Sequence, residues 1–400
     1  MRTATLPFMH SPSPPYLTPT LCTRLPLVGT TVFSRMSSLA AQHGAVNLGQ
    51  GFPDFDCAPQ LVDLVSEAMR AGHNQYPMMT GAAPLRAAIA AKIASLYGHS
   101  YDAGTEITVT AGATQALTTA ILCCVHPGDE VIVIEPAYDS YLPAIALAGG
   151  VPVLVSMEVG DCGYSVPWDQ LAAAVSSKTR LIIINTPHNP TGTILRADDV
   201  AALADIVRGT QILILSDEVY EHMVYDGVHH ESLARHPELA ARSFIVSSFG
   251  KTYHVTGWKV GYVAAPTALT AEFRKVHQYN VFTVNTPMQH GLAGYMADPQ
   301  PYLDLPAFYQ RKRDMFRDGL AGSRFTLLPA DGTYFQCVRY DAISQKSEAQ
   351  FAEWLTAEIK VAAIPVSAFY AQGKESGIVR FCFAKKDETL RLALERLRSI

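Results

Sequence analysis

The feature that most constrains the fold is a series of short apolar runs separated by segments of helical periodicity, between residues 107 and 264. Most runs lack the alternation of apolar and polar residues seen in strands with one wet face, which indicates strands buried on both faces. Such strands alternating with helices predict an α/β fold with a doubly wound, mainly parallel sheet. The seven expected strands cover residues 107–110, 130–134, 152–155, 180–184, 212–215, 244–247 and 260–264.

The segments that flank this region predict a second, smaller α+β domain. Apolar residues at helical spacing predict helices over residues 61–71, 84–97, 308–320, 351–359 and 388–397. Later strands are expected over residues 325–328, 334–338 and 378–383. We therefore expect a large domain over residues 51–295. A discontinuous small domain is expected from residues 15–50 and 296–400, after a flexible, proline-rich arm over residues 1–14.

Composition excludes several functional classes. Apolar residues make up 48% of the chain and charged residues 17%, which excludes intrinsic disorder. The net charge of −5 gives no basic field, so neither nucleic acid nor an anionic membrane surface is an expected partner. The charge-free stretches 107–128 and 140–157 contain many Thr, Gly or Pro residues, so they predict buried strand–helix units and not membrane spans.

The cysteines and the N-terminus predict a cytoplasmic protein. The seven cysteines are scattered and form no C-x-x-C pair, so neither a disulfide framework nor a zinc site is expected. The first twenty residues contain five prolines and no continuous apolar segment, which is unlike a secretory signal.

The residues that follow the predicted strands are the candidates for chemistry, because open α/β sheets bind ligands at the carboxyl ends of their strands. Five strand ends supply a glycine-led helix start, an aromatic ring, an amide, a carboxylate with a phenol, and a lysine. These residues are Gly112, Ala113, Thr114, Tyr138, Asn189, Asp217, Tyr220, Ser248 and Lys251.

Each of these residues has an ordinary structural explanation, but their combination favours one cofactor. Gly112 could open a simple helix cap, Tyr138 could pack, Asn189-Pro190 could form a turn, and Lys251 could be a solvated charge. A phosphorylated aromatic aldehyde would use the helix start for its phosphate, the aromatic for stacking, the carboxylate for a ring nitrogen and the lysine for an imine. Pyridoxal 5'-phosphate (PLP) meets these requirements.

A metal centre is the competing interpretation of one of these segments. Asp217, Glu218, Glu221 and His222 offer ligand types, but they lack the H-x-x-x-H or clustered Cys/His spacing of common sites. We therefore expect no metal.

Several ordered motifs stand along the chain. They are Asn47-Leu48-Gly49-Gln50-Gly51-Phe52-Pro53, Asn74-Gln75-Tyr76, His188-Asn189-Pro190-Thr191-Gly192, Ser216-Asp217-Glu218-Val219-Tyr220, Ser247-Ser248-Phe249-Gly250-Lys251-Thr252 and Arg380-Phe381. Together these motifs resemble the class I/II aminotransferases, which are PLP-dependent enzymes of fold type I. The resemblance extends from about residue 24 to residue 400, and within the family it is closest to the kynurenine/glutamine transaminase branch and its bacterial methionine aminotransferases.

The resemblance implies a role for each cofactor-binding residue. Lys251 would be the Schiff-base lysine and proton shuttle, and Asp217 would pair with the ring nitrogen. Tyr220 and Asn189 would bond the ring oxygen, and Tyr138 would stack on the ring. The residues implied to hold the phosphate are Ala113, Thr114, Ser248, Lys259 and, from a neighbouring subunit, Tyr76, which implies a homodimer with shared active sites.

The resemblance also implies the substrate site and the reaction. Arg380 would clamp the substrate α-carboxylate, assisted by Asn189 and the backbone of Gly51. Lys259 stands where many members have arginine, and no second arginine is assignable to a side-chain carboxylate. The expected reaction is ping-pong transamination of an L-amino acid with an uncharged side chain, methionine or aromatic preferred, with a 2-oxo acid as acceptor.

Four alternatives remain open at this stage. Two use the same site: β-elimination on cysteine conjugates, and transamination of kynurenine or glutamine. The third is a ligand-sensing regulator, which would need a DNA-binding extension where the chain before Arg24 is short and proline-rich. The fourth is an inactive scaffold, which the completeness of the motifs disfavours.

Overall fold

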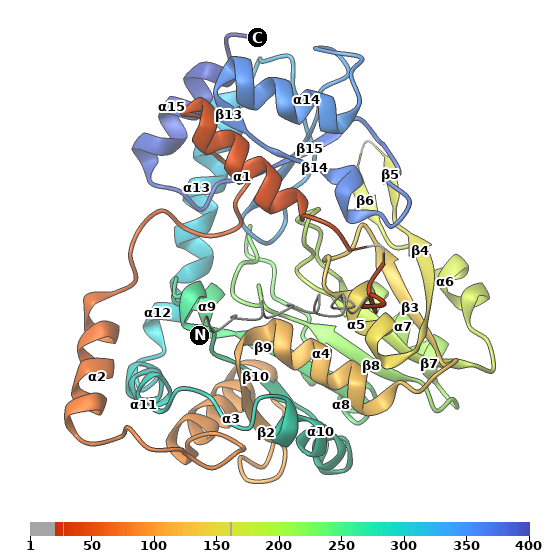
Figure 1. Ribbon diagram of the computed structural model, residues 1–400, viewed down its shortest axis with the longest axis vertical. Helices are drawn as coiled ribbons and strands as arrows, with labels where there is room; N and C mark the ends of the chain where they lie inside the picture. Colours follow the sequence, from red (N-terminus) through yellow and green to blue (C-terminus); the bar gives the residue numbers. More distant parts are fainter. Residues whose placement is uncertain (1–20, 27, 161) are drawn as a thin grey trace, which may run out of the picture.

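A computed structural model describes residues 21–26, 28–160 and 162–400 of the chain (Figure 1). The arm predicted over residues 1–14 lies outside these residues. Among the described helices, none combines the length and the apolar character that crossing a bilayer requires.

The centre of the structure is the predicted seven-stranded sheet, with strand order β2-β10-β9-β8-β7-β3-β4. The strands are β2 (Ile107–Thr110), β10 (Gly261–Ala264), β9 (Ser243–Ser248), β8 (Leu213–Asp217), β7 (Thr179–Asn185), β3 (Glu130–Glu135) and β4 (Val151–Ser156). Five strands from β9 to β4 run parallel, whereas β10 is antiparallel to both of its neighbours. Burial on both faces predicted the strands but says nothing about direction, so this reversal was not predictable from the pattern.

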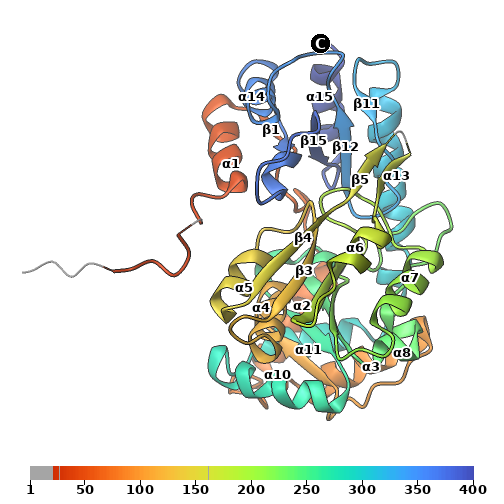
Figure 2. The same ribbon diagram turned by 90° about the vertical axis from the view of Figure 1, so that its right-hand side faces the viewer.

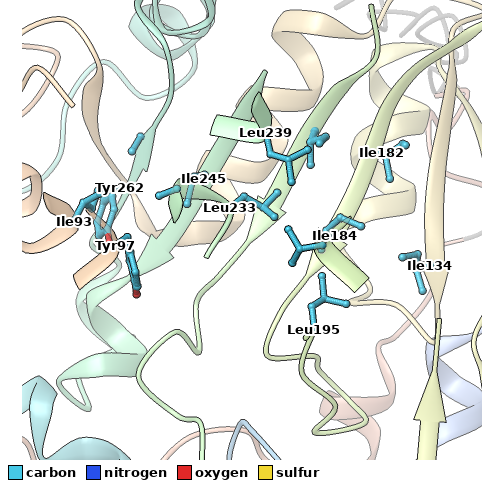
Figure 3. Packing of buried hydrophobic residues seen from close by; sticks show 14 of the residues in the cluster. Ile93, Tyr97, Ile134, Ile182, Ile184, Leu195, Leu233, Leu239, Ile245 and Tyr262 are labelled. Atoms are coloured by element: carbon cyan, nitrogen blue, oxygen red, sulfur yellow. The ribbon is translucent and has the colours of Figure 1, made fainter. Parts of the chain in front are cut away.

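Both faces of the sheet are covered, and successive residues of a strand enter different cores. Val131 and Val133 pack against α4 (Gly112–Cys124), α5 (Tyr141–Ala148) and α10 (Thr267–Asn280). Ile132 and Ile134 belong to the opposite core, part of which is shown in Figure 3. That core includes residues of α3 (Ala83–Tyr97), α6 (Trp168–Ala174), α7 (Ala197–Val207), α8 (Pro237–Ala240) and α11 (Thr286–Tyr295).

The C-terminal third of the chain and residues near the N-terminus lie together at the top of Figures 1 and 2, above the large sheet. Their buried side chains form a further core, separate from the two on the faces of that sheet. Its four-stranded antiparallel sheet has the order β11 (Thr326–Leu327), β12 (Phe335–Arg339), β15 (Ile378–Cys382), β14 (Ile364–Pro365). β1 (Val46–Asn47) pairs in parallel with β13 (Val361–Ala362), so the early chain joins the late chain through backbone hydrogen bonds. The expected domain limits at residues 50 and 295 stay a prediction.

The helices of this region and the remaining elements complete the fold. α1 (Val32–His43) contacts a π-helical turn, Leu355–Ile359, which directly follows α14 (Glu348–Trp354), and α13 (Leu305–Leu320) packs on α15 (Asp387–Leu397). α2 (Pro59–Arg70) packs on α11, and α12 (Gln300–Leu303) precedes α13. The hairpin β5 (Glu158–Gly160) and β6 (Gly163–Ser165) extends beyond β4.

Helices α1, α5, α10 and α11 were not predicted from the sequence. α1 carries readable end signals: the Thr31 side chain accepts from the Ser34 N–H, and Gly44 ends the helix with φ of 59°. α5 is almost wholly apolar, so it lacks the amphipathic pattern on which the helix predictions relied.

The core predicts a sharp stability difference between buried and exposed apolar residues. Ile182 on β7 is fully buried, so Ile182→Ala should lower the free energy of unfolding by about 2–5 kcal/mol. Leu147→Ala on α5, where the side chain is 41% exposed, should change it far less. Chemical denaturation followed by circular dichroism measures both, and equal losses would contradict the buried position of Ile182.

Candidate active site

A cavity of about 260 Å³ opens where β7, β8 and β9 end. All residues predicted for cofactor or substrate binding line it, apart from Tyr76. They are Gly51, Gly112, Ala113, Thr114, Tyr138, Asn189, Asp217, Tyr220, Ser248, Lys251, Lys259 and Arg380.

Tyr76 lies on the surface of the chain, away from this cavity. Its side chain is 81% exposed, and its ring makes an edge contact with Phe282 at 5.3 Å between centroids. A single chain therefore does not bring Tyr76 to the other site residues.

One end of the cavity is built to hold an anion. α4 begins at Gly112, which has φ of 76°, and no side chain caps its N-terminus. The first N–H groups of a helix have no acceptor within it and carry partial positive charge. A Cβ atom on Gly112 would lie 3.3 Å from Lys259 Nζ, so glycine makes room for this ammonium beside the helix end. Thr114 and Ser248 add hydroxyl groups to the same wall.

Asp217 is the buried acid of the cavity. It is the last residue of β8 and is 3% exposed, and burial raises the pKa of its carboxyl to about 6. Tyr141 at the start of α5 donates a hydrogen bond of 2.7 Å to Asp217 Oδ2, which opposes this rise by stabilising the carboxylate. Asp217 and Glu218 do not open a helix, since a turn follows them.

Two further buried carboxylates anchor the loop that carries Asp217 and Tyr220. Glu218 accepts hydrogen bonds from the Ser216 hydroxyl at 2.8 Å and the Leu233 N–H at 3.1 Å, and it pairs with His230 at 2.8 Å. These contacts tie the end of β8 to the short turn at Leu233–Arg235.

Glu221 fixes the other end of this loop. It forms an ion pair with Lys92 of α3 at 2.6 Å and accepts from the Tyr262 hydroxyl at 3.1 Å, and Tyr97 and Ser247 also donate to it. Burial alone would raise the pKa of Glu221, but the charge of Lys92, with smaller effects from His222 and the Ser247 hydroxyl, holds it far below its usual value. Two of the four residues considered as metal ligands from the sequence, Glu218 and Glu221, thus accept hydrogen bonds from protein donors.

Lys251 stands in the cavity wall on α9 (Phe249–Thr252), directly after β9. Burial lowers the pKa of its amine to about 8, and the charges of Arg380 and Lys259 act in the same direction. Its Nζ donates to the Gly51 carbonyl at 3.1 Å and to the Tyr334 hydroxyl at 2.9 Å. A substantial fraction of this amine is therefore neutral, and nucleophilic, near physiological pH.

Arg380 on β15 supplies a buried cation that is held in place yet incompletely paired. Its guanidinium donates to Asn189 Oδ1 at 2.6 Å and to the Gly49 carbonyl at 3.1 Å. The group lies 3.8 Å from the Phe335 ring centroid, and its Nε has no partner among the described residues. A buried donor without an acceptor is suited to an incoming carboxylate.

The sequence reasoning missed residues that support these groups. Tyr141 was not recognised as the partner of Asp217, although it lies just after the Glu135–Tyr138 strand end. Asn185 was also missed: its Nδ2 donates to the Asp217 carbonyl at 2.8 Å, and its Oδ1 accepts from the Asn189 N–H at 2.8 Å. The signal for Asn185 was its place as the first polar residue after an apolar strand.

PLP fits this arrangement on the geometry of the site. The uncapped helix with Lys259 suits its phosphate, the Asp217 carboxylate suits its ring nitrogen, and the Lys251 amine suits its aldehyde. When bound, PLP acts as an electron sink that labilises the bonds of a substrate's α-carbon.

Comparison with known proteins shows the class. Residues 44–397 match the family "Aminotransferase class I and II", and the chain belongs to this family of PLP-dependent enzymes with fold type I. It is an aminotransferase.

Individual relatives refine this similarity. The chain is 50% identical to the methionine aminotransferase of Escherichia coli over 94% of this chain and 97% of that protein. A crystal structure of an E. coli methionine aminotransferase superposes with a TM-score of 0.93 over 96% of this chain and all of that one. A kynurenine–oxoglutarate transaminase from Dictyostelium discoideum is 34% identical over 92% of this chain and 94% of its own.

The Tyr141 contact predicts a pH-dependent loss of activity. Tyr141→Phe removes a hydrogen bond to the Asp217 carboxylate, so the pKa of Asp217 should rise further above about 6. Hydrogen bonds to charged groups contribute about 1.5–3 kcal/mol, so kcat/KM should fall about tenfold or more. The loss should grow as the pH is lowered, because the raised pKa protonates Asp217 earlier on the acid side.

Steady-state kinetics of the cofactor-loaded protein across acid and neutral pH measure this effect. Tyr164→Phe is the matched control, because the Tyr164 hydroxyl is buried and has no partner among the described residues. A loss in Tyr141→Phe that is the same at every pH would argue against an action through Asp217.

Proposed function

We propose that this aminotransferase uses L-amino acids with uncharged side chains as donors, with methionine as a preferred one. The observation that carries this proposal is the charge of the cavity. In the described part of the chain, the cationic side chains that line it are Lys251, Lys259 and Arg380. The cofactor aldehyde, the phosphate and the α-carboxylate account for these three, so this chain offers none of its own for a carboxylate on the substrate side chain. Phe33, Phe52 and Phe335 add apolar walls.

The cofactor would be held by the residues at the strand ends. Lys259, Ser248, Thr114 and the backbone of Gly112 and Ala113 would bind the phosphate. Asp217 would keep the ring nitrogen protonated, and Tyr220 and Asn189 would bond the ring oxygen. Tyr138, beside Thr114 in the wall, would stack on the ring.

The substrate would be held by Arg380 and processed by Lys251. Arg380 would orient the α-carboxylate, with Asn189 and the backbone of Gly51 assisting. Lys251 Nζ would then accept the proton of the substrate α-carbon and return a proton to the aldehyde carbon of the cofactor. A 2-oxo acid would reverse these steps in the second half of a ping-pong cycle.

Kynurenine and glutamine are second candidates as donors. The 34% identity to a kynurenine–oxoglutarate transaminase favours kynurenine, whose aromatic side chain suits the same apolar walls. β-Elimination on a cysteine conjugate would use the same residues and would release pyruvate.

We propose a homodimer with shared active sites. Tyr76, Met78 and Tyr279 expose 81%, 67% and 91% of their side chains, and such large exposed apolar groups are typical of an interface. From there Tyr76 would reach the phosphate of the neighbouring subunit. We also propose a cytoplasmic location, because all seven cysteines are free thiols.

Donor choice is tested with the purified, PLP-loaded protein. L-Methionine with a 2-oxo acid should give one new amino acid for each methionine consumed. Its kcat/KM should exceed that of L-aspartate by about a hundredfold or more, because the cavity has no partner for a second carboxylate. Lys251→Ala should abolish turnover, whereas Lys178→Ala, at an exposed surface lysine, should not. Preferred use of aspartate would refute the proposed donor class.

The shared site is tested by mixing two variants that are each impaired on their own. Tyr76→Ala and Lys251→Ala chains should each be impaired as homodimers. Co-expression should restore about a quarter of wild-type activity, since half of the dimers are mixed and each mixed dimer has one intact site. If Tyr76 served the site of its own chain, no mixed dimer would be intact and no activity would return.

A further inference from the structure

Tyr334 forms the shorter of the two hydrogen bonds of Lys251 Nζ, at 2.9 Å against 3.1 Å to the Gly51 carbonyl. It lies just before β12, and its side chain is fully buried behind the cavity wall. Its hydroxyl accepts a hydrogen bond of 2.9 Å from Lys251 Nζ and donates one to the Gly51 carbonyl. The same carbonyl accepts from Lys251 Nζ at 3.1 Å. The amine, the phenol and the carbonyl therefore form a closed triangle of hydrogen bonds.

The Tyr334 ring is fixed by its neighbours, so its hydroxyl has little freedom to move. The rings of Tyr220, Tyr309 and Phe335 lie within 5.2, 5.7 and 4.9 Å of it between centroids, in edge or tilted orientations. Burial raises the pKa of Tyr334 well above its ordinary value, so the phenol stays protonated and keeps its donor for Gly51.

The triangle has a consequence for the free amine of Lys251. A neutral amine has two N–H donors and one lone pair. Tyr334 and Gly51 occupy both donors, so the remaining tetrahedral position belongs to the lone pair. While both N–H groups are bound, the lone pair of Lys251 points away from the Tyr334 hydroxyl and the Gly51 carbonyl. It is therefore free to accept a proton.

We propose that Tyr334 is a positioning residue, which together with the Gly51 carbonyl holds the released Lys251 amine with its lone pair directed to the substrate. In the step concerned, the Cα–H bond of the substrate breaks and a new N–H bond forms on Lys251 Nζ. The electron pair of the broken bond stays with the substrate, and PLP would supply the electron sink for it. This inference rests on the proposed function, because it assigns Tyr334 to the proton transfer of that reaction.

The chain offers a closely matched control. Tyr309 is also fully buried in the same aromatic cluster, and its hydroxyl has no partner among the described residues. Tyr334→Phe and Tyr309→Phe therefore delete the same atom from neighbouring rings, but only the first touches Lys251.

The first measurement uses the protein without cofactor. Competitive labelling of lysines with acetic anhydride at a series of pH values, read by mass spectrometry, gives the pKa of Lys251. In Tyr334→Phe this pKa should fall by about one unit, because an acceptor that favours the ammonium form is lost. The other groups that face this amine, Asp217, Arg380, Lys259 and Cys382, are unchanged in both variants. In Tyr309→Phe the pKa of Lys251 should match the wild type.

The second measurement is a single turnover of the PLP-loaded protein with L-methionine, followed by cofactor absorbance. In Tyr334→Phe the rate should fall about tenfold to hundredfold, with methionine binding unchanged. Methionine deuterated at Cα should slow this variant more than the wild type, because proton transfer has become the slow step.

The outcomes separate the two proposals. If the wild type fails to convert methionine, the proposed donor is wrong. If the wild type converts methionine but Tyr334→Phe matches Tyr309→Phe in the pKa of Lys251, in rate and in deuterium effect, the positioning role of Tyr334 is wrong. A slower Tyr334→Phe with an unchanged deuterium effect and pKa would also overturn it, because a purely structural defect gives that result.

Discussion

The site depends on the parallel alignment of strands that are buried on both faces. Because β7, β8 and β9 run in one direction, Asn185, Asp217 and Ser248 arrive at the same edge of the sheet from separate parts of the chain. Each strand also carries the loop that follows it, and so delivers Asn189, Tyr220 and Lys251. Packing on both faces holds the strands in place, and the strands in turn determine where the side chains of the cavity lie.

Burial then adjusts the protonation of the groups that the sheet brings together. The pKa of Asp217 rises and the pKa of Lys251 falls, and loss of water is the largest cause of both shifts. The loop after β8 also contains the buried carboxylates Glu218 and Glu221, and a buried carboxylate is costly unless hydrogen-bond donors satisfy it. The Leu233 N–H donates to Glu218, and Lys92 of α3 pairs with Glu221, so these contacts also anchor the loop.

Much of this could be predicted from the sequence, and the limits have physical reasons. Apolar runs predicted the strands and their order along the chain, and the polar residues after them predicted the cavity wall. The direction of β10 was not predictable, since burial on both faces is the same for either direction. Tyr141 and Tyr334 were missed because they meet Asp217 and Lys251 across 76 and 83 residues of sequence, and local patterns carry no information on such contacts.

The hydrogen bonds of Arg380 connect the two ends and the middle of the chain. Gly49 and Asn189 accept hydrogen bonds from the guanidinium. Arg380 itself lies on β15, near the C-terminus, and this strand pairs with β12 and β14. During synthesis, Gly49 and Asn189 leave the ribosome long before Arg380. A chain that stopped short of β15 would already contain Lys251 and Asp217 of the large sheet, yet it would lack the guanidinium that we propose to bind the substrate α-carboxylate. On this proposal, substrate recognition is the last function that the polypeptide acquires as it is made.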